Sequence, residues 1–329
     1  MKQINYYFYG FGGVGGFFGS ILLAALDKNL LDKKLVTVTF ITRDETAKSL
    51  IQDGIVLKSQ LFGDHHFKDF SVIPSNKLKY LPENSVIFIC TKTYHIPEVA
   101  NILKNKIPNS ARIVTLQNGV STHEYLQKYF NNEIVNPGMC WIVSERDNLN
   151  TIIQSAGQCK IYFGTGTGIR DKLLLATAKD LTTASNGILN ECYSDSVYDM
   201  LWQKYVFMLA FSGVTAYFKK TIGEILSEKD TYSFTMKVLQ ESFILAAVSG
   251  YPISEPAKEI IKNRIDNYLT INGHATSSMA RDIMAGKQSE IEVMHGYASR
   301  LGEKHGLELE CIQEIYNMLQ SSGYKLDEN

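Results

Sequence analysis

Three glycines near the N-terminus have the spacing of a phosphate-binding loop. They form Gly10-x-Gly12-x-x-Gly15, directly after an aromatic, strand-like run and directly before a helix-compatible segment. In such a unit the first glycine permits a tight turn, the second lets a pyrophosphate approach the backbone, and the third lets helix and strand pack closely. A glycine-rich turn that binds nothing is the alternative, and the strand–loop–helix context argues against it. The pattern predicts dinucleotide contacts from Gly10, Phe11, Gly12, Gly13, Val14 and Gly15.

The end of the second strand-like run addresses which dinucleotide binds. An NAD enzyme tends to place Asp or Glu there for the ribose 2′-hydroxyl, whereas an NADP enzyme tends to place an Arg that pairs with the 2′-phosphate. This chain has Thr42 and Arg43 at the tip, and a guanidinium is a bidentate match to phosphate. The sequence therefore predicts NADP (NADPH). Asp44 keeps NAD open, because a shift of one residue would bring a carboxylate to the tip.

Two further polar residues follow later strand-like runs. Lys92 comes after the run that ends at Cys90, and Asn118 comes after the run that ends at Leu116. Ligands of open α/β sheets bind outside the carboxyl ends of the strands, so both side chains are expected on the nicotinamide side of the crevice. A solvated lysine and an Asn-Gly turn are the alternatives.

Lys204 is the only charged residue in the apolar stretch 200–218. On a helix it shares a face with Phe207, Met208 and Phe211, where an ammonium group is costly. Because burial lowers the pKa of a lysine, such a group is suited to donate a proton near neutral pH. The alternative is a lysine whose stem passes the aromatic residues to reach solvent.

Glu290 is the second charged residue on an apolar stripe. Positions 290, 294, 297 and 301 fall on one face of a predicted helix, so the carboxylate lines up with Met294, Tyr297 and Leu301. A glutamate on a core-facing stripe needs a partner or a substrate hydroxyl. A surface glutamate with a slightly different helical period is the alternative.

The elements that must position these residues change character along the chain. Up to about residue 195, strand-like runs alternate with helix-compatible stretches, which predicts an α/β Rossmann-type domain with a parallel sheet wrapped by helices. After residue 195 the segments suit helices alone. We therefore predict an NADP-binding domain over 1–195 and an all-α catalytic or substrate domain over 196–329. The expected strands are 4–9, 35–41, 85–90, 111–116 and pieces of 134–164; the expected helices are 17–26, 171–186, 197–218, 229–250, 255–270, 276–304 and 308–320.

Composition narrows the function classes. A chain of 329 residues is long enough for two domains, and its net charge of −1 gives no reason to expect nucleic acid or a membrane as partner. Five widely spaced cysteines without a C-x-x-C pair fit a reducing, cytoplasmic setting better than a disulfide framework. No histidine pattern predicts a metal site. Glycines interrupt the apolar N-terminal stretch, which argues against a signal peptide.

The ordered combination of motifs resembles the ketopantoate reductase (2-dehydropantoate 2-reductase) family. The glycine loop is followed by T-K-T-Y and V-T-L-Q-N-G-V, and L-W-Q-K ends at Lys204. S-S-M-A-R-D then precedes K-Q-S-E-I, which contains Glu290, and Glu241 with Gly250 resembles a further pair. The resemblance runs from residue 10 to about residue 306. It implies a helical domain like that of 6-phosphogluconate dehydrogenase, and NADPH-dependent reduction of a 2-oxo acid, ketopantoate to pantoate first, as in pantothenate biosynthesis.

The resemblance also implies roles for individual residues. Lys204 would be the acid that meets the negative charge on the carbonyl oxygen, and Glu290 would hydrogen-bond the substrate and help to orient Lys204. Ser278 would hold the substrate carboxylate or hydroxyl, although a serine near a helix start is otherwise a common cap. Asn118, Lys92 and Ser212 would contact the substrate as well; Lys92, Asn118 and Glu290 would also contact the cofactor.

Three positions depart from the family pattern. Met208, Ser212 and Ala275 stand where the family typically has asparagines. Fewer amide contacts leave the substrate open: the alternatives are a different, less polar 2-oxo acid, or a non-catalytic NADP(H)-sensing protein. Retention of both Lys204 and Glu290 argues against a sensor. The sequence leaves a homodimer open.

Overall fold

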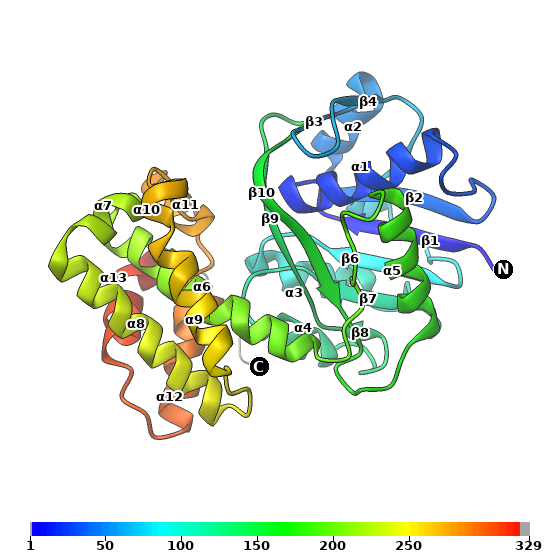
Figure 1. The fold of residues 1–329 in the computed structure, drawn as a ribbon. Coiled ribbons are helices and arrows are strands. Elements are labelled where there is room, and N and C mark those ends of the chain that lie inside the picture. Colours follow the sequence, from blue (N-terminus) through cyan, green and yellow to red (C-terminus); the bar gives the residue numbers. More distant parts are fainter. Residues whose placement is uncertain (1, 323–329) are drawn as a thin grey trace. The chain divides into compact units, whose positions relative to one another are not determined.

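The computed structural model describes residues 2–322, apart from the side chains of residues 156, 157, 269 and 271. The chain divides into two compact units, an α/β unit and a helical unit, which we describe separately (Figure 1). The α/β unit holds the chain up to Gln117 together with Thr122–Val197. The helical unit holds the chain from Tyr198 on and, unexpectedly from the sequence, the short segment Asn118–Ser121.

A six-stranded parallel sheet forms the centre of the α/β unit. Its strand order is β5-β2-β1-β6-β7-β8, so the first strand is central and the chain winds outward from it in both directions. This doubly wound order confirms the predicted α/β fold class and places a topological switch point between β1 and β6. The strands are β1 (Ile4–Tyr9), β2 (Val36–Thr42), β5 (Ser71–Pro74), β6 (Ser85–Ile89), β7 (Arg112–Thr115) and β8 (Val135–Asn136).

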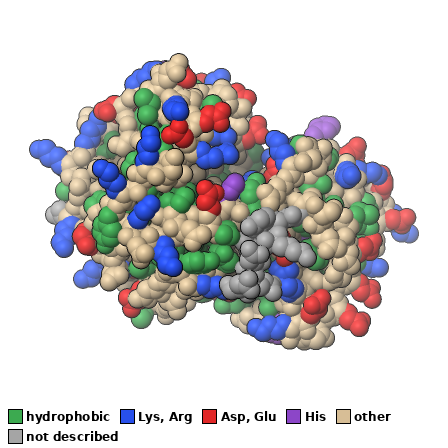
Figure 2. Space-filling view, turned by 180° about the vertical axis from the view of Figure 1, so that it is seen from behind, with side chains coloured by type: hydrophobic (Ala, Val, Ile, Leu, Met, Phe, Trp, Pro, Cys, Tyr) green, Lys and Arg blue, Asp and Glu red, His purple; other side chains and the backbone are tan. Residues whose placement is uncertain are grey.

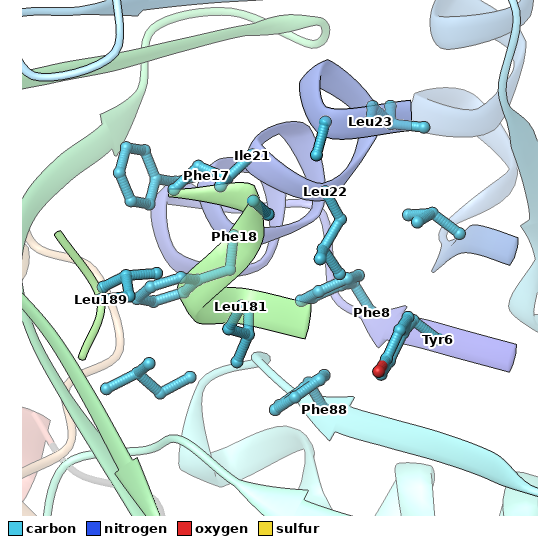
Figure 3. Packing of buried hydrophobic residues seen from close by; sticks show 14 of the residues in the cluster. Tyr6, Phe8, Phe17, Phe18, Ile21, Leu22, Leu23, Phe88, Leu181 and Leu189 are labelled. Carbon is cyan, nitrogen blue, oxygen red and sulfur yellow. The ribbon is translucent and has the colours of Figure 1, made fainter. Parts of the chain in front are cut away.

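Alternating side chains of the sheet form two separate cores, because successive residues of a strand point to opposite faces. Tyr6 and Phe8 pack with helices α1 (Gly13–Asp27) and α5 (Lys172–Ala184), as Figure 3 shows. Tyr7 and Tyr9 instead join the core beneath α3 (Ile96–Leu103) and α4 (Thr122–Gln127). Strands of this sheet are therefore apolar on both faces, which is why they read as continuous hydrophobic runs.

A second, four-stranded sheet lies over α1 and was not predicted as a separate sheet. Its order is β4-β3-β10-β9, with β9 and β10 forming a long antiparallel hairpin. Helix α2 (Asp44–Asp53) and this sheet occupy much of the sequence that had no assigned strands between residues 43 and 84. The strands are β3 (Ile55–Ser59), β4 (His65–Phe67), β9 (Gly138–Arg146) and β10 (Thr151–Phe163).

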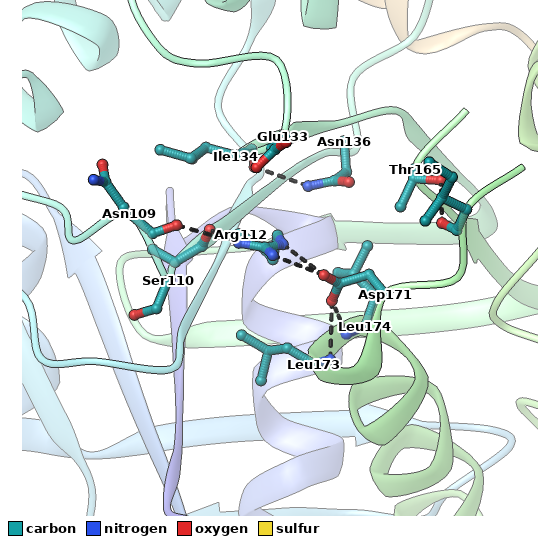
Figure 4. Close-up of polar contacts among 12 residues, drawn as sticks. Asn109, Ser110, Arg112, Glu133, Ile134, Asn136, Thr165, Asp171, Leu173 and Leu174 are labelled. Carbon is teal, nitrogen blue, oxygen red and sulfur yellow. Dashed lines mark hydrogen bonds and ion pairs between the residues drawn. The ribbon is translucent and has the colours of Figure 1, made fainter. Parts of the chain in front are cut away.

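An ion pair joins α5 to the central sheet. Arg112 on β7 donates from Nη2 and Nε to one carboxylate oxygen of Asp171, at 2.7 and 2.9 Å (Figure 4). The other carboxylate oxygen accepts the backbone N–H groups of Leu173 and Leu174, both at 2.9 Å. Asp171 therefore both caps the N-terminus of α5 and links that helix to the sheet.

The helical unit begins with the long helix α6 (Val197–Phe218), which agrees with the sequence prediction to the residue. It continues with α7 (Ile222–Ser227), α8 (Lys229–Val248), α9 (Glu255–Asp266), α10 (Tyr268–Ile271), α11 (Ser278–Met284), α12 (Tyr297–Lys304) and α13 (Glu310–Leu319). The carboxylate of Glu241 on α8 accepts two backbone N–H groups of the first turn of α13, at 2.9 Å each. Glu241 is therefore a helix cap.

The prediction of one helix over 276–304 was wrong. Helix α11 stops after Met284, and Gly286 adopts a φ of +64°, the left-handed conformation that commonly ends a helix. The chain becomes helical again only near Glu290, and Glu292–Gly296 forms a π-helix before α12. A π-helix is common at functional sites and is not visible in a pattern read at 3.6 residues per turn.

No helix among residues 2–322 combines the length and the apolarity that crossing a bilayer requires. Acidic and basic side chains are interspersed over the face drawn in Figure 2. The five cysteines are free thiols, and four of them are buried.

Candidate active site

The glycine loop has the backbone geometry that phosphate binding requires. Gly10 has a φ of +105°, and a Cβ placed on it would lie 2.9 Å from the Thr91 nitrogen. A Cβ on Gly15 would lie 2.2 Å from the Gly10 carbonyl oxygen, so a side chain there would force α1 away from the loop. Gly12 is the N-cap of α1, and a Cβ placed on it would meet no atom within 4 Å. The loop thus leaves open space at the start of a 15-residue helix, where backbone N–H groups favour an anion.

Gly13, which was predicted to contact the cofactor, is also required for packing, because a side chain there would clash with β9. A Cβ on Gly13 would lie 2.3 Å from the Ser144 carbonyl oxygen on β9, and the Ser144 hydroxyl donates to the Gly13 carbonyl at 2.9 Å. Gly16 likewise makes room for Ile152 on β10. The β9–β10 hairpin therefore presses directly on the loop and the first turn of α1.

Phe11 and Val14 can contribute only backbone to a bound phosphate. The ring of Phe11 is buried and meets Phe40 edge to face, with 5.3 Å between ring centroids. Val14 packs against the same apolar core. Their side chains hold the loop on the sheet, and their amides stay at the helix start.

Arg43 and Asp44, which follow the end of β2, have different surroundings. Thr42 is the buried last residue of β2, and exposed Arg43 is the N-cap residue of α2. Asp44 begins that helix and pairs with Lys48 at 2.8 Å and Lys77 at 3.9 Å. Its hydrogen bond with Lys48 is the main reason that the pKa of Asp44 is lowered. The Asp44 carboxylate, on which the NAD alternative depended, is therefore paired with two lysines.

The carboxyl ends of β6 and β7 are tied together by a residue that sequence reasoning gave no role. The side-chain amide of Gln117 donates to the carbonyls of Ile89 and Thr91 at 2.8 and 3.0 Å. Its Oε1, and the hydroxyl of Thr91, are buried without a hydrogen-bond partner in the described part of the chain. Gln117 lies within the V-T-L-Q-N-G-V motif, so the resemblance to the family could have indicated a role for it.

These features fit a nicotinamide dinucleotide. An open cradle at the start of α1 and two unsatisfied buried oxygens at the adjoining strand ends lie where an open α/β sheet binds its ligands. Half-buried Lys92 stands at the same edge, just before the short 3₁₀ helix Thr93–His95. Asn118 follows Gln117 and starts the segment that clusters with the helical unit.

Lys204 and Glu290 are both buried in the structure. Lys204 on α6 is 7% exposed, so its side chain does not snorkel into solvent, and Glu290 is 5% exposed. The chain segments that carry them are in direct contact. The Tyr205 hydroxyl donates to the Met294 carbonyl at 2.6 Å, and the His295 ring is 3.0 Å from the Leu209 carbonyl. A Cβ on Gly213 would collide with the His295 ring at 2.3 Å, so the glycine permits this close approach.

The π-helix displaces the apolar stripe on which Glu290 was placed. Met294 is buried as expected, but Tyr297 and Leu301 are only half-buried. Glu292 and His295 take buried positions instead. The Glu292 carboxylate binds Arg300 at 2.6 Å and the Tyr316 hydroxyl at 2.8 Å. Glu290 is the other buried acid of this segment.

The two serines at the start of α11 have different surroundings. Ser277 is the N-cap: its hydroxyl oxygen accepts the Ala280 N–H and the Thr215 hydroxyl, each at 3.0 Å. Ser278 is the half-buried first residue of the helix, so the capping role weighed for it belongs to its neighbour.

Two of the positions that depart from the family pattern form hydrogen bonds to the helical backbone. Ser212 is 1% exposed, and its hydroxyl donates to the Met208 carbonyl one turn earlier. Ala275 is half-buried and its carbonyl accepts the Ile222 N–H at 2.9 Å. A serine proton that is held by its own helix is not available to a ligand.

An aromatic stack extends the face of α6 that carries Lys204. Phe207 and Phe211 stack on each other at 5.5 Å, and Tyr268 stacks on Phe211 at 5.0 Å. The Arg264 guanidinium lies 5.7 Å from the centre of the Phe207 ring. Burial is the main cause that raises the pKa of Tyr268 and lowers that of Arg264.

Comparison with known proteins gives consistent matches. Residues 6–168 match the family described as "Ketopantoate reductase PanE/ApbA", and residues 196–322 match its C-terminal counterpart. An "Uncharacterized oxidoreductase YkpB" of Bacillus subtilis (strain 168) is 27% identical over 312 residues, or 94% of this chain and 96% of that protein. The 2-dehydropantoate 2-reductase of Yersinia pestis is 21% identical and covers 75% of this chain and 77% of its own length.

A solved structure of D-mandelate dehydrogenase with NADH and anilino(oxo)acetate has a similar fold. Its TM-score is 0.81 at 16% identity, and the superposition covers 97% of this chain and 98% of that one.

Proposed function

Because the chain belongs to the ketopantoate reductase family, we propose that it uses NADPH to reduce a 2-oxo acid to the 2-hydroxy acid. Ketopantoate, whose reduction gives pantoate for pantothenate synthesis, is the first substrate to test. The observation that carries the proposal is the burial of Lys204 beside the π-helical segment that follows Glu290. Residues 1–195 would bind the cofactor and residues 196–329 would supply the catalytic side chains. The free cysteines fit a cytoplasmic setting.

The residues of the α/β unit would hold the cofactor. Backbone N–H groups from Gly10 to Gly15 would receive the pyrophosphate, and Arg43 the 2′-phosphate. Lys92 and the unsatisfied oxygens of Thr91 and Gln117 would meet the nicotinamide end. NADPH, when bound, supplies the hydride that reduces the carbonyl carbon.

The residues of the helical unit would handle the proton. Lys204 would donate a proton to the carbonyl oxygen as negative charge develops there, and a desolvated ammonium stabilises such charge far better than a hydrated one. Glu290 would accept a hydrogen bond from the substrate and keep Lys204 oriented. Ser278, Asn118 and Lys92 would bind the substrate, and Ser212, whose proton is held by the Met208 carbonyl, would contact it only as a hydrogen-bond acceptor. Asn118 and Glu290 would also contact the cofactor.

A second candidate is the same reaction on a 2-oxo acid with an apolar or aromatic side chain. The supporting observation is the Lys204 face of α6, where Met208 replaces an amide and Phe207, Phe211 and Tyr268 form a stack. The proton of Ser212 is held by the helix backbone. The structurally similar D-mandelate dehydrogenase is described with anilino(oxo)acetate, a 2-oxo acid derivative that carries an aromatic ring.

The test is a substrate screen that follows NADPH absorbance with the full chain. The panel holds ketopantoate, branched aliphatic 2-oxo acids and phenyl 2-oxo acids, and Lys204→Ala serves as the inactive control. Turnover of any member that Lys204→Ala abolishes supports a reductase, and the ranking by kcat/KM decides between the two candidates. NADPH binding with no turnover of the panel would favour the sensing alternative.

A further inference from the structure

We propose that Arg146 is a second specificity-determining arginine, which binds the 2′-phosphate of NADP(H) together with Arg43. The inference rests on the proposed function and assigns to the β9–β10 hairpin a role in cofactor choice.

The position of Arg146 carries the argument. It is the last residue of β9, and its Nη1 donates to the Phe11 carbonyl at 3.3 Å and to the Thr46 hydroxyl at 3.4 Å. Phe11 belongs to the glycine loop, and Thr46 lies in the first turn of α2, three residues after Arg43. The guanidinium therefore bridges the loop after β1 and the helix after β2. The adenosine ribose of a dinucleotide lies by the end of β2 in this fold, between those two elements.

The guanidinium groups of Arg43 and Arg146 are close enough for their charges to interact. Burial lowers the pKa of Arg146, and the nearby positive charge of Arg43 lowers it further, while Glu45 opposes the effect. Arg43 also acts on His95, whose pKa is lowered chiefly by burial, with Glu98 opposing. Within residues 2–322 neither Arg43 nor Arg146 forms an ion pair with a carboxylate. Like charges repel, and a dianionic phosphate would satisfy both guanidinium groups through charge-assisted hydrogen bonds.

A purely structural role explains Arg146 less well. The hairpin is already anchored to the loop by the shorter bond from Ser144 to the Gly13 carbonyl, at 2.9 Å. Arg146 adds two longer bonds through a single nitrogen, and in the described chain its Nε and Nη2 donate to no acceptor. Those two nitrogens form the edge of a guanidinium that binds a phosphate in bidentate fashion.

The experiment uses adenosine fragments, because these report on the site without turnover. Calorimetry measures the Kd of 2′,5′-ADP and of 5′-AMP for the full chain, for Arg146→Gln and for Arg146→Lys. Lys160→Gln is the matched control: it removes the positive charge of an exposed residue of β10, which pairs with Trp141 and lies several residue pairs from Arg146. We expect Arg146→Gln to weaken 2′,5′-ADP by about tenfold or more and 5′-AMP by less than twofold. Arg146→Lys should be intermediate and Lys160→Gln unchanged.

Other outcomes would overturn the inference in distinguishable ways. Equal losses for both fragments in Arg146→Gln would show that the arginine only holds the glycine loop. An unchanged preference for 2′,5′-ADP in that variant would show that Arg43 suffices, and the proposed NADPH dependence would stand without Arg146. A wild-type protein that binds the two fragments equally would overturn the NADP assignment itself, and Arg146 with it.

Discussion

Tyr205 donates a 2.6 Å hydrogen bond to the carbonyl oxygen of Met294, so the residue after Lys204 is fastened to the π-helix that follows Glu290. Both partners are buried. The Met294 carbonyl also accepts the backbone N–H of Tyr297, so the Tyr205 hydroxyl is a second donor to it, one that comes from α6. The bond therefore fixes how the two segments with the predicted catalytic residues face each other within the helical unit.

Tyr205→Phe should lower kcat by about tenfold and leave the Kd of NADPH unchanged. Removing the hydroxyl takes away the donor that links α6 to the buried Met294 carbonyl, a loss of about 0.5–1.5 kcal/mol that weakens the positioning of Lys204 and Glu290. Steady-state kinetics and cofactor fluorescence measure the two quantities. Tyr217→Phe, at the far end of α6, removes a hydroxyl that bonds to Glu314 and should leave kcat unchanged. Equal kcat values for the two variants would contradict a positioning role for Tyr205.

Lys204→Ala should reduce turnover by at least about 10² and keep NADPH affinity close to that of the wild type. General acid catalysis by a positioned group contributes about 10²–10⁴ in rate. Lys262→Ala, which removes an exposed lysine from α9 of the same unit, is the control for charge and should retain full activity. A Lys204 variant that loses cofactor binding but keeps its rate would show that this lysine is not the acid.

Arg43→Ala should erase most of a preference for NADPH over NADH. A charge-assisted bond to phosphate contributes about 1.5–3 kcal/mol, which predicts a wild-type preference of about ten- to hundredfold. Fluorescence titration of both cofactors gives the ratio. Lys48→Ala is the companion variant, because it removes the shorter of the two ion pairs of Asp44 and leaves the Arg43 guanidinium unchanged. Equal affinities for the two cofactors in the wild type would contradict the assignment.

The helical unit should lose stability as the pH falls from about 6.5 to 4. Burial lowers the pKa of His295 to about 4, and the hydrogen bond to the Leu209 carbonyl opposes the shift only in part. Between these pH values the unfolded chain binds the proton and the folded chain does not, so acid favours unfolding. From pH 7.5 to pH 5 the free energy of unfolding should drop by about 2 kcal/mol because of this one group.

The measurement separates His295 from other groups by a variant and a local reporter. His123 in the α/β unit has its pKa lowered to about 4 by burial as well, so the signal must come from the helical unit alone. The chain has two tryptophans, and Trp141→Phe leaves buried Trp202 on α6 as the reporter. In that background His295→Gln should make urea unfolding less sensitive to pH by about 2 kcal/mol. The same pH dependence with and without His295 would contradict the prediction.

Local patterns determined much of what the sequence could predict. β1 over Ile4–Tyr9 and α6 over Val197–Phe218 were identified with their ends, because each is a mainly apolar segment bounded by clear breaks. The second sheet was not identified. Its strands are short or irregular, and the pairing of β3 with β10 joins residues almost 100 positions apart. No local periodicity reports such a contact.

The candidate site shows the same division. Glycine spacing identified the loop. The structure adds that Gly13 has no room for a side chain, because Ser144 on a hairpin distant in sequence packs against it. Arg146 was not selected from the sequence, because nothing near it in the chain indicates a contact with Phe11. The π-helix at Glu292–Gly296 was missed for a different reason: an extra residue per turn keeps the segment helical and changes only which side chains are buried.

Substrate preference gives the last prediction: ketopantoate, if accepted, should be a poor substrate, and asparagines at positions 208 and 212 should improve it. An amide that bonds a substrate hydroxyl or carboxylate contributes about 0.5–3 kcal/mol, so the loss of two lowers kcat/KM by about 10 to 10⁴. The structure supports the expected loss at position 212, because the buried Ser212 hydroxyl already donates to the Met208 carbonyl. The thioether of Met208 suits an apolar substrate branch instead.

We expect Met208→Asn with Ser212→Asn to raise kcat/KM for ketopantoate and lower it for phenyl 2-oxo acids, with the NADPH Kd as the control for folding. A wild-type kcat/KM for ketopantoate of about 10⁵ M⁻¹s⁻¹, within the ordinary enzyme range, would show that other residues supply these contacts.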